Sequence, residues 1–306
     1  MTSADLPALR EPATPVSAPP AHPVWQPPRI WRFLLWLSRY VVPAFCRLRI
    51  SGEIPAELRG RPYILACNHV GTFDPIALTG AFAKLGVAPR ILATGGLFRA
   101  PFVGRVLARC GHLRVDRGRT NVVDALDTAA AAIADGAVIA GYPEGRITLD
   151  PGLWPERART GMARLALITR APVIPVSIWG AHEVVAYHGF GAMAWRLLVS
   201  AVRRPVVHVR FGAPVELSDL SVDQPRHPLH ASNRIIAAIT DGLRPLRADE
   251  PGLPRYVDLT RPVSTARTLA RGVIAGVPQV RQDRLSGGTH PERLSGLGDP
   301  AVGRTE

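Results

Sequence analysis

A histidine and an aspartate stand five residues apart in the stretch "ACNHVGTFDP", which directly follows the apolar run "YILA". These residues are His69 and Asp74, and Asn68 precedes the histidine. A carboxylate that meets an imidazole fixes its tautomer and stabilises the imidazolium, so that the histidine can act as a general base. The same spacing also fits a loop that ends a strand, with Asp74 as the N-cap of the next helix. This stretch alone leaves both interpretations open.

Further polar segments follow later apolar runs. Arg117 lies in "GHLRVDRG", and Glu144, Gly145 and Arg146 lie in "GYPEGRIT". A guanidinium can bind phosphate through two hydrogen bonds, and a glycine lets backbone N–H groups approach an anion. A carboxylate does not contact phosphate favourably, so we expect Glu144 to hold an arginine or an acceptor hydroxyl. Taken alone, Arg117 is equally explained as an exposed charge at a strand end.

Together with "APVIPVSIWG" (171–180), these segments resemble the glycerolipid acyltransferase family. That family carries N-H-x-x-x-x-D, then G-x-I-x-[IV]-[DN]-R, then F-P-E-G-T-R-S, then an apolar block with a central proline. The first block is complete here, and the resemblance covers roughly residues 47–215. The later blocks match at Gly111, Leu113, Val115, Asp116 and Arg117, then at Pro143, Glu144 and Gly145 with Tyr142 for phenylalanine, then at Pro175.

The resemblance implies an enzyme like 1-acylglycerol-3-phosphate O-acyltransferase. His69 would take the proton of an acceptor hydroxyl while Asp74 orients the imidazole, and the hydroxyl would attack an acyl thioester without an acyl-enzyme. The implied partners are acyl-CoA or acyl carrier protein as donor and a lysophospholipid as acceptor, with no cofactor and no metal. The substrate-binding residues that the resemblance implies are Asn68, Arg117, Glu144, Gly145, Arg146 and Pro175.

The third block departs from the family pattern, because T-R-S is replaced by Arg146-Ile147-Thr148. The arginine comes one position early, and neighbours in an extended loop point in opposite directions. The head group of the acceptor therefore stays open, with glycerol 3-phosphate, another lysophospholipid or a glycolipid as alternatives. A non-catalytic lipid-binding protein is a remote alternative, and so is a hydrolase that uses the same base. Cys67, beside His69, is expected to be a core residue and not a nucleophile.

Alternating strand-like and helix-like segments must position these residues, and this alternation indicates an α/β domain. Ligand sites of such sheets gather at the carboxyl ends of strands, where the polar segments fall. We expect a single acyltransferase domain over residues 47–247, with a mixed sheet flanked by helices. Strands are expected at 62–67, 90–93, 112–116, 137–143, 172–179 and 206–212, and helices at 75–85, 120–136, 160–170 and 232–243.

The two ends of the chain have a different composition. The sequence of 306 residues holds 30 prolines, many of them in the first 28 residues, and hydrophobic periodicity fades towards the C-terminus. Such segments cannot bury enough apolar surface to fold. We expect residues 1–28 to be a disordered proline-rich arm and residues 248–306 to be a mostly disordered tail.

The formal net charge is +13, and nearly all of the positive charge is arginine. An arginine-rich surface suits phosphates, although a GC-rich genome also explains the composition. No helix-turn-helix, zinc finger or RNA-binding strand is present, so no nucleic acid partner is expected. The three cysteines, Cys46, Cys67 and Cys110, have no paired spacing, which fits a reducing compartment.

Residues 29–46 are predicted to be an amphipathic interfacial helical segment, in which Pro43 stops the helix. Basic charge combined with tryptophan and leucine is typical of helices that lie in a membrane interface. The protein is therefore expected on the cytoplasmic face of the cell membrane, peripheral or monotopic, against an anionic membrane surface. A helix packed on the domain with its arginines in solvent is the alternative. Arg29, Arg32 and Arg39 lie on one side of this helix, and Trp36 stands beside them. The residues expected at the headgroup boundary are Trp31, Trp36 and several leucines.

Overall fold

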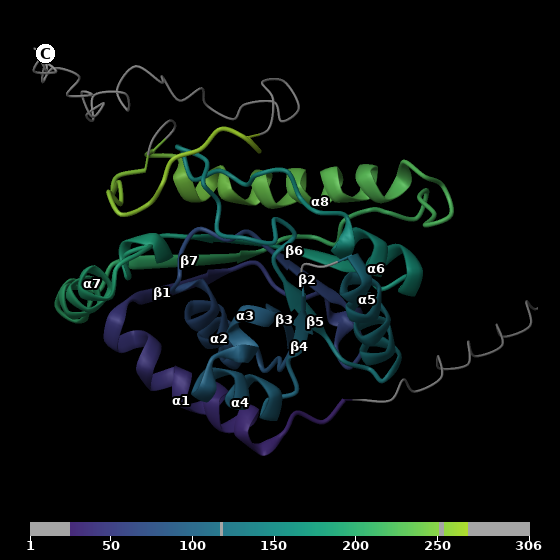
Figure 1. The fold of residues 1–306 in the computed structure, drawn as a ribbon, viewed down its shortest axis with the longest axis horizontal. Helices are drawn as coiled ribbons and strands as arrows, with labels where there is room; N and C mark the ends of the chain where they lie inside the picture. The colour runs from purple at the N-terminus through teal and green to yellow at the C-terminus, as the bar shows by residue number, and fades with distance from the viewer. Residues whose placement is uncertain (1–24, 117–118, 251–253, 269–306) are drawn as a thin grey trace, which may run out of the picture.

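A mixed sheet forms the centre of the fold, with helices on both of its faces (Figure 1). The structure is a computed structural model that describes residues 25–116, 119–250 and 254–268. The strands are β1 (Arg47–Ser51), β2 (Ile64–Cys67), β3 (Arg90–Thr94), β4 (Leu113–Val115), β5 (Ile139–Gly141), β6 (Val173–Trp179) and β7 (Val206–Phe211). The helices are α1 (Arg29–Phe45), α2 (Asp74–Leu85), α3 (Gly95–Arg99), α4 (Pro101–Arg109), α5 (Arg119–Ala134), α6 (Gly161–Thr169), α7 (Phe190–Arg203) and α8 (His227–Leu243), with short 3-10 turns at Ala56–Leu58, Ala181–Glu183 and Pro245–Arg247.

The sheet has the strand order β1-β7-β6-β2-β5-β3-β4. All neighbouring pairs are parallel except β6 and β7, which are antiparallel. Strand β2 lies between β5 and β6, and Ala66 is in register with Gly141 on one side and Pro175 on the other. The chain segments that leave β2 and β5 therefore emerge side by side at the same edge of the sheet. The predicted α/β class with a mixed sheet is confirmed.

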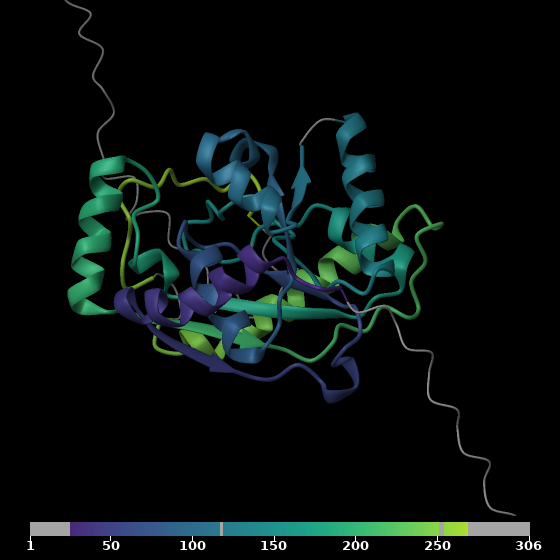
Figure 2. The same ribbon diagram turned by 90° about the horizontal axis from the view of Figure 1, so that it is seen from below.

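Helix α8 covers one face of the sheet, and α1 and α2 cover the opposite face (Figures 1 and 2). Two glycines make these close contacts possible. A Cβ on Gly242 of α8 would lie 2.3 Å from Oγ of Ser177 on β6, and a Cβ on Gly80 of α2 would lie 3.0 Å from Cγ2 of Val42 on α1. Helix α8 buries one apolar side against the sheet, with Ile235, Ile236, Ile239 and Leu243 among its buried residues.

The structure differs from the sequence prediction in several elements. Strand β1 and helices α3, α4 and α7 were not predicted, and α8 begins at His227, five residues earlier than expected. Helix α1 continues through Pro43 to Phe45, because Pro43 lies in its last turn and the N–H of Cys46 still reaches the carbonyl of Val42. No helix among the described residues is long and apolar enough to cross a membrane.

Candidate active site

The loop between β2 and α2 brings His69 and Asp74 into direct contact. Nδ1 of His69 lies 2.7 Å from Oδ2 of Asp74, and the same oxygen accepts hydrogen bonds from the N–H groups of Val70 at 2.6 Å and Gly71 at 2.9 Å. One carboxylate oxygen thus organises the whole loop as well as the imidazole. The Asp74 side chain is fully buried, whereas that of His69 is 16% exposed. The histidine is therefore accessible to a substrate while its partner is not.

Asp74 does not act as the expected N-cap. Helix α2 begins at Asp74 itself, its N-cap is Phe73, and no side chain caps its first turn. The carboxylate points back to the loop, where it accepts the hydrogen bonds of Val70 and Gly71. The structural interpretation of this aspartate as a helix cap is therefore wrong, and its side chain serves the loop and the imidazole.

Three further contacts hold His69 in place. The ring of Tyr142 stacks on the imidazole, with 3.9 Å between ring centroids and 11° between planes. The N–H of His69 donates to Oε1 of Glu144 at 3.1 Å, and its carbonyl accepts the N–H of Thr148 at 2.8 Å. With Nδ1 directed at Asp74, the tautomer that this carboxylate favours leaves Nε2 as the nitrogen that can accept a proton.

Asn68 lies directly before the histidine and is almost fully buried. Its side-chain amide donates to the carbonyl of Ile178 at 3.0 Å and accepts the N–H of Ile178 at 2.8 Å. These two bonds attach the end of β2 to β6, like an additional rung of the sheet. The structure thus places Asn68 where it positions His69, and its role towards a substrate stays a prediction.

Glu144 is fully buried in the loop after β5. Its two oxygens accept hydrogen bonds from the N–H of His69 at 3.1 Å and the N–H of Glu156 at 2.9 Å. Burial raises the pKa of Glu144 to about 8, and these two N–H donors act against that shift. Glu144 therefore joins the loop between β2 and α2, which we name the histidine loop, to the segment that precedes α6. Its side chain is not in contact with solvent.

Arg146 forms a bidentate ion pair with the buried Glu156. Its Nε donates to Oε2 at 3.0 Å and its Nη2 donates to Oε1 at 2.7 Å. The Arg146 side chain is 31% exposed, and its Nη1 makes no hydrogen bond to another described residue. Gly145, just before it, has a φ of +68°, and a Cβ there would lie 3.0 Å from Cδ of Arg159. The turn thus requires glycine, and a further arginine lies against it.

The remaining residues considered in the sequence analysis are Arg117, Pro175 and Cys67. Arg117 lies outside the described residues, next to the end of β4. Pro175 lies in the fully buried strand β6, in register with Ala66. Cys67 is buried, and its burial raises the pKa of the thiol and so disfavours the thiolate. This agrees with a core role for Cys67.

Sequence reasoning missed several residues that contact the site. Glu156, Arg261 and Arg267 were not singled out, because no spacing connects them with the histidine block. Arg261 and Arg267 belong to the predicted tail, yet residues 254–268 lie against the loops that follow β2 and β5. The structure differs here from the predicted domain boundary. The ion pair between the buried Glu156 and Arg146 leaves no recognisable pattern in the local sequence.

A His–Asp pair at the carboxyl edge of an α/β sheet has a geometry in which a histidine can activate a hydroxyl. Residues 47–179 match the model of the family described as Acyltransferase. This stretch contains β2, β5 and β6 together with the histidine loop and the loop after β5, which we name the Glu144 loop. The matched stretch is thus similar to the acyltransferase family, and it contains the four sequence blocks.

Two relatives and one solved structure are similar to this chain. A 1-acyl-sn-glycerol-3-phosphate acyltransferase of Cocos nucifera is 24% identical over 174 residues, which is 56% of this chain and 52% of the relative. An uncharacterized protein of Mycobacterium tuberculosis is 28% identical over 158 residues, or 48% of this chain and 41% of the relative. The chain thus spans about half the length of these relatives. The crystal structure of a 1-acyl-sn-glycerophosphate acyltransferase from Thermotoga maritima shares the fold, with a TM-score of 0.52, 18% identity and coverage of 71% of this chain and 80% of the other.

Proposed function

We propose that this protein transfers a fatty acyl group from an acyl thioester to the free hydroxyl of 1-acyl-glycerol 3-phosphate. The observation that carries this proposal is the 2.7 Å contact between His69 and the buried Asp74. Nε2 of His69 accepts the proton of the hydroxyl while the hydroxyl oxygen attacks the thioester carbonyl. The carbon–sulfur bond then breaks, and the proton passes from the imidazole to the leaving thiolate. The acyl donor is acyl-CoA or acyl carrier protein, and no acyl-enzyme forms.

Asp74 supports this step because it is a buried acceptor on the far side of the imidazole. When His69 takes the proton, the positive charge arises 2.7 Å from a carboxylate that the backbone already holds in place. Electrostatic stabilisation by fixed groups needs little reorganisation and is therefore strong. Tyr142, stacked on the ring, limits the rotation of the imidazole away from this geometry.

The phosphate of the acceptor is proposed to bind beside Arg146. The Glu156 pair fixes the guanidinium plane, and Nη1 remains available to a phosphate oxygen. Arg117, predicted for the same role, lies outside the described residues, and β4, which precedes it in the sequence, is parallel to β3 and ends at the same edge of the sheet. Because Arg146 comes one position earlier than the arginine of the family pattern, glycerol 3-phosphate is a second candidate acceptor. It carries the same phosphate on a smaller molecule.

An acyl-transfer assay tests this proposal. Purified protein in detergent is given acyl-CoA, or the acyl carrier protein thioester, with a panel of lysophosphatidate, glycerol 3-phosphate, lysophosphatidylcholine and a glycolipid. We expect an ester product with lysophosphatidate and a loss of roughly 10²–10⁴-fold in kcat for His69→Ala. His230→Ala, which removes an exposed histidine of α8, is the matched control and should keep full activity. Thioester hydrolysis without any ester product would refute acyl transfer.

We also propose that the protein works at the surface of an anionic bilayer, on the cytoplasmic face. The structure changes which residues of α1 could contact lipid. Trp31, Leu35 and Val42 are buried in the core, so Trp31 cannot serve the membrane as expected. The exposed large side chains of α1 are Phe33, Trp36, Tyr40 and Val41, which lie on the solvent side together with Arg29 and Arg32.

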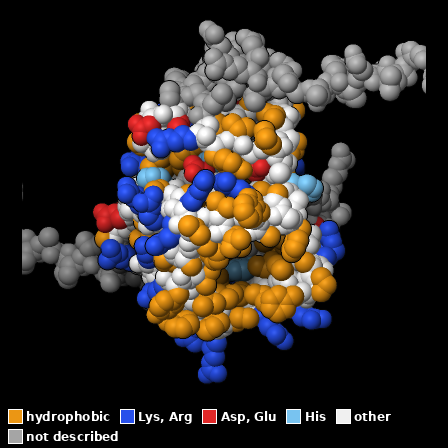
Figure 3. Space-filling model, turned by 90° about the vertical axis from the view of Figure 1, so that its left-hand side faces the viewer, with side chains coloured by type: hydrophobic (Ala, Val, Ile, Leu, Met, Phe, Trp, Pro, Cys, Tyr) orange, Lys and Arg blue, Asp and Glu red, His pale blue; other side chains and the backbone are white. Residues whose placement is uncertain are grey.

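Helix α7 packs beside α1 and extends this apolar surface. Its residues Phe190, Trp195, Leu198 and Val202 are exposed, with Phe190 at 89%. Arg203 ends the helix and Arg204 follows it. Figure 3 shows the side of the molecule on which α7 lies, where hydrophobic side chains cover much of the lower half and Lys and Arg side chains project at the edge. Aromatic residues flanked by arginine are typical of interfacial helices.

Point substitutions test this membrane proposal better than a deletion, since removing α1 would remove part of the core. We expect the double variant Trp36→Ala, Trp195→Ala to bind anionic vesicles at least roughly tenfold more weakly, because each indole loses its contact with lipid. Ile168→Ala, an exposed apolar residue of α6, is the control. Binding should also weaken as salt rises. Equal vesicle binding by the double variant and the control would refute this surface.

A further inference from the structure

Residues 254–268, which we name the C-terminal segment, return to the active-site loops after α8. Asp258 accepts the N–H of Tyr187 at 2.6 Å, and the N–H of Ser264 donates to the carbonyl of Leu149 at 2.9 Å. Further along, Oγ1 of Thr268 donates to Oδ1 of Asp150 at 3.1 Å. The segment is thus attached at several points along its length, to the loop after β5 and to the loop that precedes α7.

Arg261 is the residue of this segment that reaches the histidine loop. Its Nη2 donates to the carbonyl of Val70, the residue after the histidine, and its Nη1 donates to the carbonyl of Thr148 at 3.4 Å. Thr148 in turn donates its N–H to the carbonyl of His69 at 2.8 Å. One guanidinium therefore joins the two backbone segments that enclose His69.

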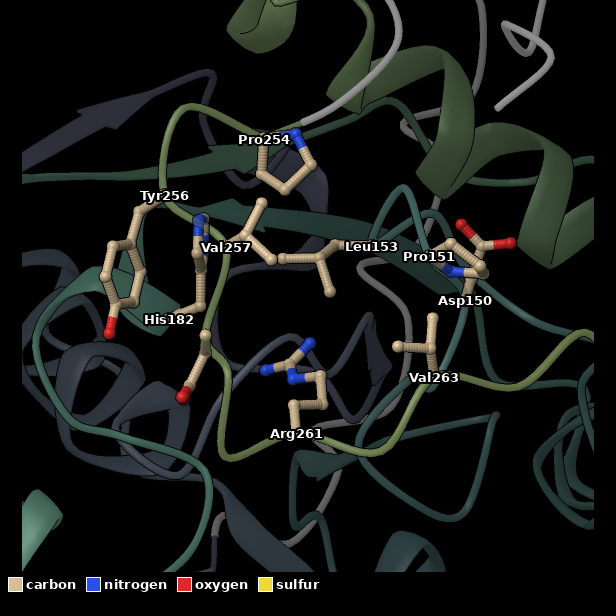
Figure 4. Close-up of a pocket in the computed structure, with 10 residues that line it drawn as sticks. Asp150, Pro151, Leu153, His182, Pro254, Tyr256, Val257, Arg261 and Val263 are labelled. Atoms are coloured by element: carbon tan, nitrogen blue, oxygen red, sulfur yellow. The ribbon is translucent and has the colours of Figure 1, made fainter. Parts of the chain in front are cut away.

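The surroundings of Arg261 favour a fixed cation at this point. Burial lowers the pKa of the guanidinium, and the negative charges of Asp74 and Asp258 oppose this shift. Oδ1 of Asp74 is buried and has no hydrogen-bond partner among the described residues, so a nearby positive charge compensates for part of its burial. Figure 4 shows Arg261 projecting from the C-terminal segment into a pocket that His182 and Leu153 line from the other side.

Arg267 adds a second attachment of the same kind. Its Nη2 donates to the carbonyl of Glu144 at 3.0 Å and also to the carbonyl of Arg157. The backbone of this residue accepts the N–H of Arg157 at 3.2 Å. The C-terminal segment thus holds both the histidine loop and the Glu144 loop, and it does so through arginine donors on main-chain carbonyls.

We infer that Arg261 is a positioning residue for acyl transfer, which keeps His69 directed at Asp74 through the carbonyls of Val70 and Thr148. The expected effect of Arg261 on turnover rests on the proposed function. Its expected effect on the geometry of the loop that carries His69 does not. A lysine can donate to one carbonyl as a point charge, whereas only the planar guanidinium can span both in a fixed arrangement. Arg261 touches none of the reacting atoms, so substrate binding should not depend on it.

The experiment compares Arg261→Ala and Arg261→Lys with Arg255→Ala in the full chain. Arg255 is an exposed arginine of the same segment that pairs with Asp249 and Glu250, away from the histidine loop. We expect Arg261→Ala to lower kcat by roughly ten- to a hundredfold with little change in either KM, because a small displacement of the base suffices for such a loss. Arg261→Lys should recover part of kcat, and Arg255→Ala should resemble the unmodified protein.

Amide hydrogen exchange of Val70 and Gly71 provides a readout that needs no turnover, because both N–H groups bond to Asp74. Their protection should fall by roughly tenfold or more in Arg261→Ala and not in Arg255→Ala. Unchanged protection would overturn the inference whatever happens to kcat, and so would a rise in acceptor KM without a loss of kcat. Lost protection in a protein that transfers no acyl group would refute the proposed function and leave the positioning role standing.

Discussion

Replacing Asp74 by Asn changes one atom of the side chain and tests the proposed base directly. Oδ2 of Asp74 accepts three hydrogen bonds, from Nδ1 of His69 and from the N–H groups of Val70 and Gly71. An asparagine oxygen can keep the two backbone donors, because these need only an acceptor. The amide then carries no negative charge to stabilise an imidazolium, and it no longer holds the imidazole as strongly in the required tautomer.

The magnitude follows from these contacts. Loss of tautomer control and of the counter-charge should lower kcat by roughly 10²–10⁴-fold, the range of general-base effects. Asp74→Ala should lose activity to a similar degree and also leave two buried N–H donors without an acceptor. Each such donor costs about 1–3 kcal/mol, so the alanine variant should be less stable by about 2–6 kcal/mol and the asparagine variant by much less.

The assay measures kcat in detergent for both variants and the free energy of unfolding in urea. The expected pattern is a similar loss of kcat in both variants and a loss of stability mainly in Asp74→Ala. If Asp74→Asn kept turnover within about threefold of the unmodified protein, the pair would not act as a base and its orienting carboxylate. If both variants lost activity only in proportion to lost folded protein, the carboxylate would be structural.

Two further predictions concern the loop after β5. Arg146→Ala should raise the acceptor KM far more than the donor KM, because its Nη1 faces the proposed phosphate site, and an unchanged acceptor KM would place the phosphate elsewhere. The folded pKa of Glu144, about 8, lies above its ordinary value of 4.5, so the folded protein keeps a proton that the unfolded chain releases between these values. The unfolding free energy of the unmodified protein, measured relative to Glu144→Gln in urea, should therefore fall as pH rises from about 5 to 8. A difference that stays constant over this range would contradict the raised pKa.

The histidine block could be found in the sequence because its contacts are local. His69 and Asp74 are five residues apart, and the loop between them is closed by hydrogen bonds within the same stretch. The strands could also be found, since buried parallel strands appear as short apolar runs. Shorter or atypical elements were missed, such as α3 with five residues and β1, whose residues alternate between exposed and half-buried.

The amphipathic pattern of α1 predicted a helix but not its orientation. Its arginines lie on one side, but its aromatic residues lie on more than one side, so the sequence does not tell which aromatic side chain faces the domain. Packing decided the matter: Gly80 of α2 lets Val42 approach, and Trp31 on the same side of α1 is buried against His112. Trp36 is thereby left on the solvent side. A periodic pattern specifies two faces, and only tertiary contacts decide which one is covered.

The sequence by itself determined the α/β class, the His69–Asp74 pair and the order of the four blocks, because each depends on residues close together in the chain. Only the tertiary structure decided which distant groups meet them. Tyr142 stacks on His69 because β5 lies beside β2, and Glu156 pairs with Arg146 because a loop folds back. Arg261 contacts Val70 across 191 positions of sequence. Local periodicity records that a helix or strand has two unlike faces, whereas the partner of a charged side chain depends on how the sheet orders its strands and where the chain returns.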